Sequence, residues 1–119
     1  MKQIYIVGAG GFGREVYNWM SDVIDLESNY AFKGFLDDNP KALDGFPIDA
    51  EVIRIADYSC NSEDFLICGI GNPLLKKKLC LPLIKMGCEF LTLIHPSAII
   101  GPSSRIGQGS VICPKVVIT

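Results

Sequence analysis

The stretch KQIYIVGAGGFG, residues 2–13, joins a run of β-forming side chains to a glycine-rich loop. Residues 3–7 predict a short buried strand, because consecutive β-branched and aromatic side chains stop at a glycine. Gly8 allows a tight turn, Gly10 lets a phosphate approach the backbone, and Gly13 lets a following helix pack closely. The N-terminus of such a helix offers free N–H groups and partial positive charge. The stretch therefore predicts a phosphate-binding turn between a strand and a helix. The alternative is a turn required only for packing.

Strands and helices alternate after this loop, as the apolar periodicity indicates. We expect a helix over residues 13–26, strands over 30–37, 65–70 and 90–94, and a second helix from Asn72-Pro73 to Gly87. Pro82 inside that helix predicts a kink near residues 78–82 or two shorter helices. Residues 41–61 show no clear pattern beyond a short apolar run at 52–55. The order of elements predicts a parallel sheet with right-handed crossovers.

Isoleucine recurs every six residues at the end of the chain, at positions 94, 100, 106, 112 and 118. Small or β-branched residues follow the first four of them at a constant spacing: Ala98, Ser104, Ser110 and Val116. Such a hexapeptide repeat is typical of a coil with three flat faces. The isoleucines are expected to point inward and stack from coil to coil, while the small residues fit the tight corners. The alternative is a β-rich tail with chance spacing.

Two predicted strands end in residues suited to a nucleotide, because ligands of open α/β sheets bind at the carboxyl ends of the strands. Asp37 and Asp38 can accept hydrogen bonds from ribose hydroxyls or from a base N–H. They could equally form a solvated turn with the Asn-Pro that follows them. Gly71 would let a base or sugar lie against the backbone. Asn72 is expected to cap the second helix in any case.

Composition argues against several classes of protein. The chain has 11 Lys and Arg against 13 Asp and Glu, with no basic stripe for nucleic acid. No apolar stretch approaches the ~20 residues that cross a bilayer, and no signal peptide is recognisable, so we expect a cytoplasmic protein without a membrane partner. The mean hydropathy of +0.31 indicates apolar surface that something else covers. The five cysteines form no CxxC pair, and we expect them to be reduced, with no bound metal.

The basic run at residues 76–78 and the single histidine, His95, each allow two interpretations. We interpret the three lysines as a solvated helix face rather than a phosphate contact. His95 has no acidic neighbour in sequence, so a structural role is favoured over that of a catalytic base. The sequence alone yields no Ser/His/Asp set, Cys/His pair or metal-ligand cluster.

Four motifs taken together resemble the NeuD/PglD-type bacterial sugar O- or N-acyltransferases. They are IVGAGGFG at 6–13, GFLDD at 34–38, GIGN at 69–72 and IHPSA at 94–98, which leads into the hexapeptides. The resemblance covers the whole chain. It implies an α/β, Rossmann-like nucleotide-sugar-binding domain over residues 1–94, with flanking helices on a small parallel sheet. The first one to two coils of a left-handed parallel β-helix would follow over residues 95–119.

The motifs and the resemblance together assign the nucleotide-sugar site to nine residues: Gly8, Gly10, Gly11, Phe12, Gly13, Asp37, Asp38, Gly71 and Asn72. Gly10, Gly11 and Phe12 would lie by the phosphates, Asp37 and Asp38 would hold the uracil and ribose, and Gly71 would lie near the base. Some members of the family carry histidine where this chain has Phe12. A phenyl ring cannot hydrogen-bond a phosphate, so another activated sugar, or one without a nucleotide, is an alternative substrate.

Family members use acetyl-CoA as co-substrate, bound between the subunits of a homotrimer that forms through the β-helix. Their catalytic histidine lies in coils beyond the point that corresponds to Thr119, so we expect no catalytic residue and no transfer activity in this chain alone. Two other functions fit the first motifs formally. One is an NAD(P)-binding oxidoreductase domain, against which the hexapeptides argue, and the other is a non-catalytic nucleotide-binding module.

Overall fold

Five parallel strands form the central sheet of the structure, a computed structural model that describes residues 2–23 and 29–119. The sheet order is β3-β2-β1-β4-β5, so β1 lies at the centre between β2 and β4. The chain therefore runs outward in opposite directions on the two sides of β1, which makes the β1–β4 boundary a topological switch point. The predicted parallel sheet is confirmed. Its strands are β1 (Lys2–Val7), β2 (Tyr30–Leu36), β3 (Glu51–Ile53), β4 (Asp64–Cys68) and β5 (Glu89–Phe90).

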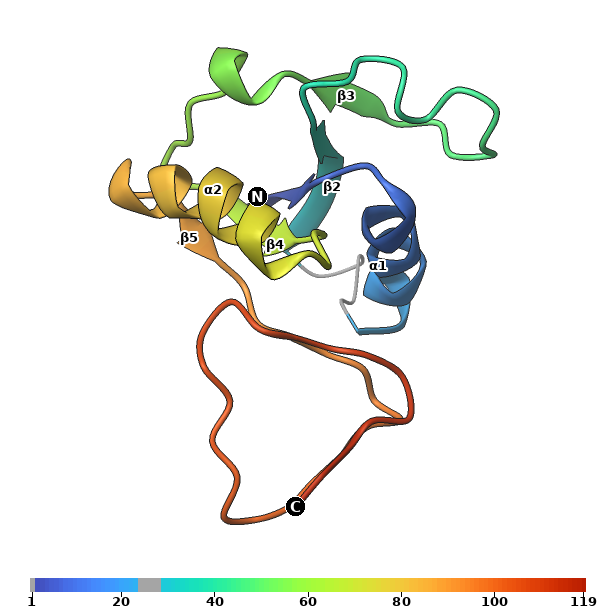
Figure 1. Cartoon of the computed structure of the whole chain (residues 1–119), viewed down its shortest axis with the longest axis vertical. Helices are drawn as coiled ribbons and strands as arrows, with labels where there is room; N and C mark the ends of the chain where they lie inside the picture. The colour runs from blue at the N-terminus through green and yellow to red at the C-terminus, as the bar shows by residue number, and fades with distance from the viewer. Residues whose placement is uncertain (1, 24–28) are drawn as a thin grey trace.

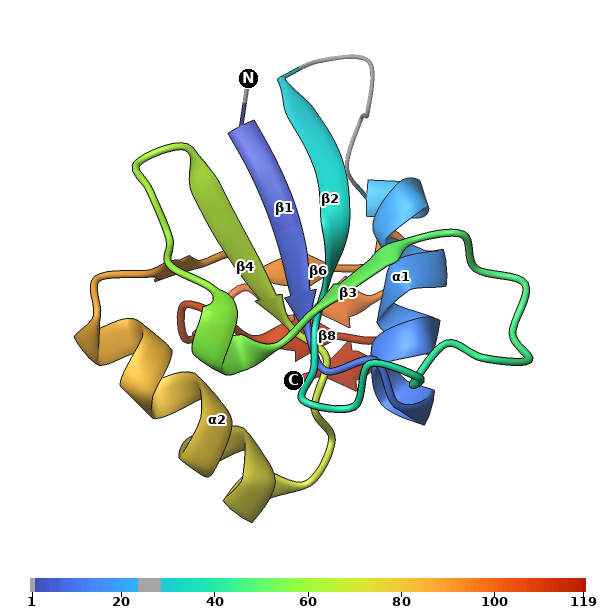
Figure 2. The same cartoon turned by 90° about the horizontal axis from the view of Figure 1, so that it is seen from above.

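One helix covers each face of this sheet, as Figure 2 shows. Alternate residues of a strand point to opposite faces, and in β1 Ile4 and Ile6 are buried against α1 (Gly11–Val23), whereas Val7 belongs to the core beneath α2 (Pro73–Lys85). The first helix starts at Gly11 rather than at Gly13. The last part of its predicted span, residues 24–26, lies outside the described residues.

Helix α2 begins and ends as the sequence predicts. The side-chain oxygen of Asn72 accepts hydrogen bonds from the N–H groups of Leu74 and Leu75, at 3.0 and 3.1 Å. At the other end Gly87 adopts the left-handed conformation, with φ of 92°. Pro82 does not divide the helix, so the expectation of two shorter helices is wrong. Pro82 lies exposed in the last turn, where its missing N–H forgoes one helical hydrogen bond, to the carbonyl of Lys78.

The predicted fourth strand over residues 90–94 is two separate strands in two sheets. The N–H of Leu91 still bonds the carbonyl of Leu66 in the central sheet, but the N–H of Leu93 bonds the carbonyl of Ser110. The chain therefore changes partners within two residues. Strand β6 (Leu93–Ile94) pairs with β8 (Val111–Ile112) instead of extending β5.

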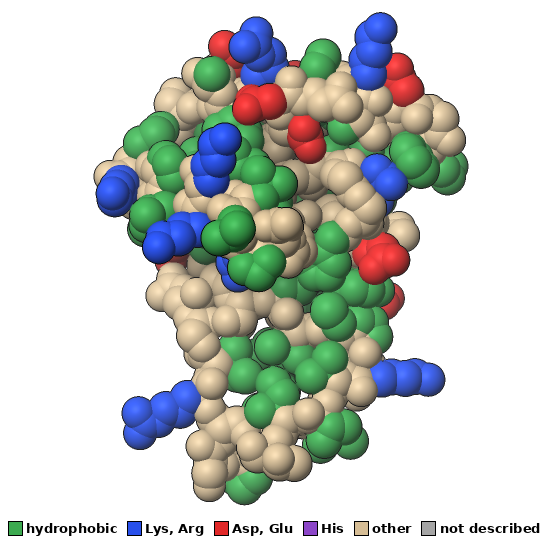
Figure 3. All heavy atoms as spheres, in the orientation of Figure 1, with side chains coloured by type: hydrophobic (Ala, Val, Ile, Leu, Met, Phe, Trp, Pro, Cys, Tyr) green, Lys and Arg blue, Asp and Glu red, His purple; other side chains and the backbone are tan. Residues whose placement is uncertain are grey.

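The C-terminal segment, residues 93–119, follows a triangular path beneath the central sheet, drawn in orange and red in Figure 1. We call this segment the C-terminal coil. Ile94 pairs in parallel with Ile112, and Ile100 of β7 (Ile99–Ile100) pairs with Ile118 of β9 (Val117–Ile118). Both pairings join residues 18 positions apart, which equals three hexapeptides. All five isoleucines of the repeat are half-buried, and Figure 3 shows hydrophobic side chains gathered in this lower part of the molecule.

A disulfide joins Cys60 and Cys88, whose Cα atoms are 5.7 Å apart. The expectation that all five cysteines are reduced is therefore wrong for this pair. The two residues are 28 positions apart in sequence, and only the fold brings the loop before β4 next to the end of α2. Cys68, Cys80 and Cys113 are free. Among the described residues, no helix combines the length and the apolar character that crossing a bilayer requires.

Candidate functional site

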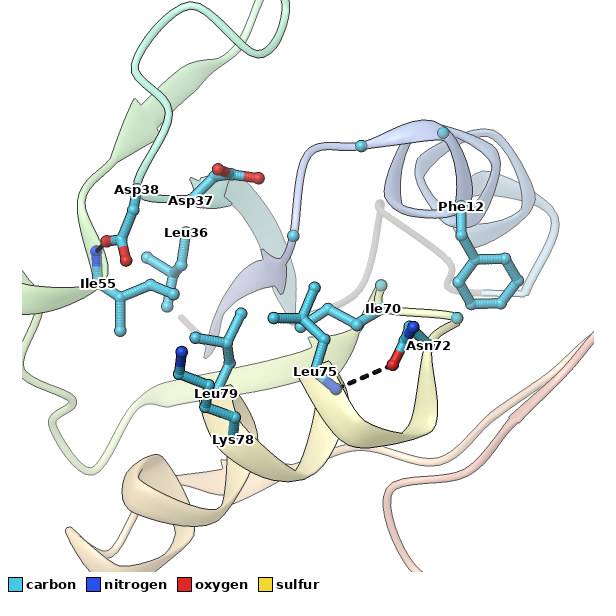
Figure 4. Close-up of a pocket in the computed structure, with 15 residues that line it drawn as sticks. Phe12, Leu36, Asp37, Asp38, Ile55, Ile70, Asn72, Leu75, Lys78 and Leu79 are labelled. Carbon is cyan, nitrogen blue, oxygen red and sulfur yellow. Dashed lines mark hydrogen bonds between the residues drawn. The ribbon is translucent and has the colours of Figure 1, made fainter.

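A pocket of about 470 Å³ lies at the carboxyl ends of β1, β2 and β4. It sits at the topological switch point of the sheet, where ligands of open α/β folds bind. Figure 4 shows its walls: the glycine loop with Phe12 on one side, the end of β2 with Asp38 on another, and α2 with Leu79 below. Eight of the nine residues predicted to bind the ligand line this pocket: Gly8, Gly10, Gly11, Phe12, Asp37, Asp38, Gly71 and Asn72.

Gly13, the ninth, does not line the pocket, and its surroundings fit the close helix packing expected of it from the sequence. A Cβ atom on Gly13 would overlap the carbonyl oxygen of Gly8. A Cβ on Gly8 would come within 2.9 Å of the Ile70 side chain, and φ at Gly8 is +96°. Gly69 is equally confined, because its Cβ would lie 2.9 Å from the Cα of Gly13. These glycines let β1, α1 and the end of β4 meet with their backbones in contact.

Gly10, by contrast, faces open space. A Cβ built on it has no neighbour within 4 Å. The backbone N–H groups of Gly10, Gly11 and Phe12 precede the first helical hydrogen bond of α1, which runs from the N–H of Arg14 to the carbonyl of Gly10. Such N–H groups at a helix start have no intrahelical acceptor. The loop can therefore present several donors and the positive end of a helix to an anion.

Asp37 and Asp38 have different surroundings. The two carboxylate oxygens of Asp37 accept hydrogen bonds from the N–H groups of Ala9 and Asn39, both at 2.8 Å. Asp37 therefore braces the glycine loop from the end of β2. Asp38 is exposed, and its Oδ1 accepts a longer bond, 3.2 Å, from the N–H of Ile55. Asp38 thus has a carboxylate oxygen available to a ligand.

Phe12 and Gly71 close the pocket on the side of the C-terminal coil. A Cβ on Gly71 would contact the Phe12 ring at 3.7 Å. The ring itself packs edge-on against Trp19, with centroids 5.9 Å apart. Phe12 is therefore fixed as an apolar wall. Any phosphate contact at this position comes from its backbone N–H.

Sequence reasoning missed seven residues of the lining. Gly69 and Ile70 adjoin the predicted Gly71, and Leu75, Lys78 and Leu79 share one face of α2, so helical periodicity could have identified them. Ile55 belongs to the short apolar run at residues 52–55, but nothing in that run indicated that it would reach the pocket. Lys78 was interpreted as part of a solvated face; it is exposed and also lines the pocket. The missed residues are Leu36, Ile55, Gly69, Ile70, Leu75, Lys78 and Leu79.

His95 lies away from this pocket and connects α1 to the coil. Its Nε2 is 3.0 Å from a carboxylate oxygen of Asp22, and its Nδ1 accepts the N–H of Ser97 and lies 2.8 Å from the Ser97 hydroxyl. The structure thus assembles an Asp/His/Ser set that the sequence did not reveal. The Ser97 oxygen also accepts the N–H of Lys115, and none of the three side chains lines the pocket. The arrangement supports the structural role favoured for His95.

Comparison with known proteins gives consistent results. The family model described as the PglD N-terminal domain matches residues 3–81. The chain is 33% identical over 116 residues to UDP-N-acetylbacillosamine N-acetyltransferase of Bacillus subtilis, and 29% identical over 119 residues to GDP-perosamine N-acetyltransferase of Escherichia coli O157:H7. These alignments cover 94% and 96% of this chain but 51% and 52% of the relatives, so the chain spans about half of their length.

Among solved structures, the fold is similar to the acetyltransferase domain of PglB from Neisseria gonorrhoeae FA1090 in complex with acetyl coenzyme A. The TM-score is 0.75 at 28% identity, over 98% of this chain and 55% of that one. The homologous proteins are sugar N-acetyltransferases. Within the described residues, no group of three or more His, Cys, Asp or Glu side chains could hold a metal ion.

Proposed function

Because the chain belongs to the PglD N-terminal domain family, we propose that it is the nucleotide-sugar-binding part of a sugar N-acetyltransferase. One observation carries the proposal: the glycine loop presents unpaired N–H groups to a pocket at the switch point of the sheet, opposite the free carboxylate oxygen of Asp38. A nucleoside diphosphate has the matching chemistry, with anionic phosphates at one end and hydroxyl and N–H donors at the other.

The nucleotide would lie with its phosphates at the N–H groups of Gly10, Gly11 and Phe12. Its ribose or uracil would donate to Asp38. Lys78, exposed at the edge of the pocket, would add positive charge for the diphosphate. The names of the two relatives specify a UDP-sugar and a GDP-sugar as substrates, which supports a nucleotide-bound amino sugar, and we assign UDP as the carrier.

The C-terminal segment would be the start of the second domain. We place the boundary at residue 94 and assign residues 95–119 to a left-handed parallel β-helix, supported by the 18-residue stacking of the repeat. Ile99 and Val117, 64% and 62% exposed on the outside of the coil, fit a homotrimer packed through this domain. Acetyl-CoA and the catalytic histidine would belong to further coils of a cytoplasmic enzyme of glycan biosynthesis.

The binding site is tested by titrating the ¹⁵N-labelled chain with UDP and following its backbone amide resonances. We expect the largest shifts at Gly10, Gly11 and Phe12, because their N–H groups would bond the phosphates directly. Shifts confined to the coil, or no shifts at millimolar UDP, would contradict the proposal.

A further inference from the structure

Two free cysteines face each other beneath the floor of the pocket. The sulfur atoms of Cys68, the last residue of β4, and Cys80, in α2, are 3.8 Å apart. Both side chains are buried, 3% and 5% exposed. The third free cysteine, Cys113, lies in the coil. Cys68 and Cys80 therefore form a dithiol that spans two elements of the fold.

Small cavities lead to this dithiol from the surface. Cys68 and Cys80 both line a cavity of about 110 Å³ between α2 and the coil, together with Lys76. Cys68 also lines a neighbouring cavity of about 260 Å³ beside Phe12. A molecule little larger than water fits such spaces. We therefore expect hydrogen peroxide to reach the sulfur atoms through these cavities.

The hydrogen bond between the thiols makes them chemically unequal. The S–H of Cys80 donates to the sulfur of Cys68 and lowers the pKa of the Cys68 thiol, against the opposing effect of burial; the ammonium group of Lys76 lowers this pKa further. The same bond, together with burial, raises the pKa of Cys80. Cys68 thus has the lower pKa of the two thiols. Its S–H donates to the carbonyl oxygen of Ile70 at 3.8 Å, and loss of this proton gives the thiolate, which is the form that attacks an oxidant.

We propose that Cys68 and Cys80 form a peroxide-sensitive site, with Cys68 as the attacking residue and Cys80 as the resolving one. The Cys68 thiolate attacks one oxygen of hydrogen peroxide, the O–O bond breaks, and the released hydroxide takes a proton to become water. The Cys80 sulfur then attacks the sulfenic acid of Cys68, loses its proton and releases a second water. In balance, two thiols and one peroxide become one disulfide and two waters.

The new bond would link the two elements that form the floor of the pocket. Cys68 directly precedes Gly69 and Ile70, which line the pocket, and Cys80 directly follows Leu79, which lines it from α2. Oxidation would therefore fix the separation of β4 and α2 at the site. Under the proposed function, it would make nucleotide-sugar binding responsive to peroxide.

The test is to treat the folded chain with hydrogen peroxide near neutral pH and to map its thiols. Under denaturing conditions the free thiols should fall from three to one, which is Cys113, whose pKa burial raises. Cleavage after lysine and after Glu63 separates the peptides that hold Cys60, Cys68 and Cys80. The expected product is a disulfide between the Cys68 and Cys80 peptides, with the Cys60–Cys88 link unchanged.

A matched pair of variants separates the roles of the two thiols. In Cys80→Ser the sulfenic acid of Cys68 has no resolving partner, so a dimedone adduct should accumulate at Cys68, whereas Cys113→Ser should form the disulfide as the wild type does. The mapping of the wild type does not depend on whether Cys80→Ser folds. Wild-type protein that keeps three thiols, that oxidises first at Cys113, or that carries sulfinic acid on Cys68 without a disulfide would overturn the proposal. These outcomes are independent of nucleotide binding, so they test this site separately from the proposed function.

Discussion

Asp37 and Asp38 are neighbours in sequence, but their carboxylates differ in what they contact. Replacing Asp38 with Ala removes an exposed carboxylate that would bond the nucleoside, and a hydrogen bond to a charged group contributes roughly 1.5–3 kcal/mol. We expect Asp38→Ala to weaken binding of a UDP-sugar about 10- to 150-fold. Its free energy of unfolding should change little.

Asp37→Ala serves as the comparison. It leaves the N–H of Ala9, a fully buried residue, without its acceptor, which costs about 1–3 kcal/mol. We therefore expect a lower free energy of unfolding in denaturant, together with weaker binding. If both variants bound the UDP-sugar with normal affinity, Asp37 and Asp38 would serve only as part of a turn.

Gly10 is the position where a side chain would meet the ligand and not the protein. A valine there has open space around its Cβ, so Gly10→Val should retain the far-ultraviolet circular dichroism and melting temperature of the parent chain. Its branched side chain would occupy the space of the phosphate, and calorimetry should detect no binding of a UDP-sugar. Gly107→Val, in the coil, is the control and should bind normally. Unchanged affinity in Gly10→Val would exclude the loop as the phosphate site.

At the scale of elements, the sequence predicts those features that depend on residues close together in the chain. The strand–glycine loop–helix unit, the cap at Asn72 and the end of α2 at Gly87 follow from neighbouring residues. The glycine loop and the residues that follow the strands lie at the carboxyl ends of parallel strands, which meet at one edge of the sheet. For this reason eight of the nine predicted residues line one pocket. Individual functions do not all follow from position: Asp37, expected to hold the nucleoside, accepts the N–H of Ala9 and braces the glycine loop.

The features that the sequence missed depend on contacts between distant residues. After Leu91 the chain leaves the central sheet, and the N–H of Leu93 bonds the carbonyl of Ser110. The disulfide joins residues 28 apart, and His95 lies beside Asp22 of α1. The apolar run at residues 52–55 does not indicate that Ile55 lines the pocket. Local periodicity carries no information on such pairings.

The coil is expected to be the least stable element of the described structure. Strands β8 and β9 each pair on one side only, in sheets of two strands, and repeat folds gain stability from several stacked units. We expect fast amide hydrogen exchange over residues 106–119 in dilute solution, and slower exchange when the protein concentration is raised. The second effect follows because an uncovered strand edge pairs readily with another chain. Strong protection in a proven monomer would show that the segment folds in another way.

At the scale of the whole molecule, binding and catalysis would be separate. The chain spans about half of its relatives, and its single histidine is bonded to Asp22 and Ser97, away from the pocket. We therefore expect this chain alone to transfer no acetyl group from acetyl-CoA to a nucleotide-bound amino sugar, as measured by release of the coenzyme A thiol. Turnover that His95→Ala abolished would instead identify His95 as the base.

The central claim is that the pocket at the glycine loop binds a nucleotide-sugar, and calorimetric titration of the chain with a UDP-sugar, NAD and coenzyme A in turn tests it most directly. We predict saturable heat with the UDP-sugar alone. At 100 times its dissociation constant, this ligand should raise the free energy of unfolding by about 2.7 kcal/mol. Saturable binding of NAD, with no response to the UDP-sugar, would contradict the account and identify the pocket as a dinucleotide site.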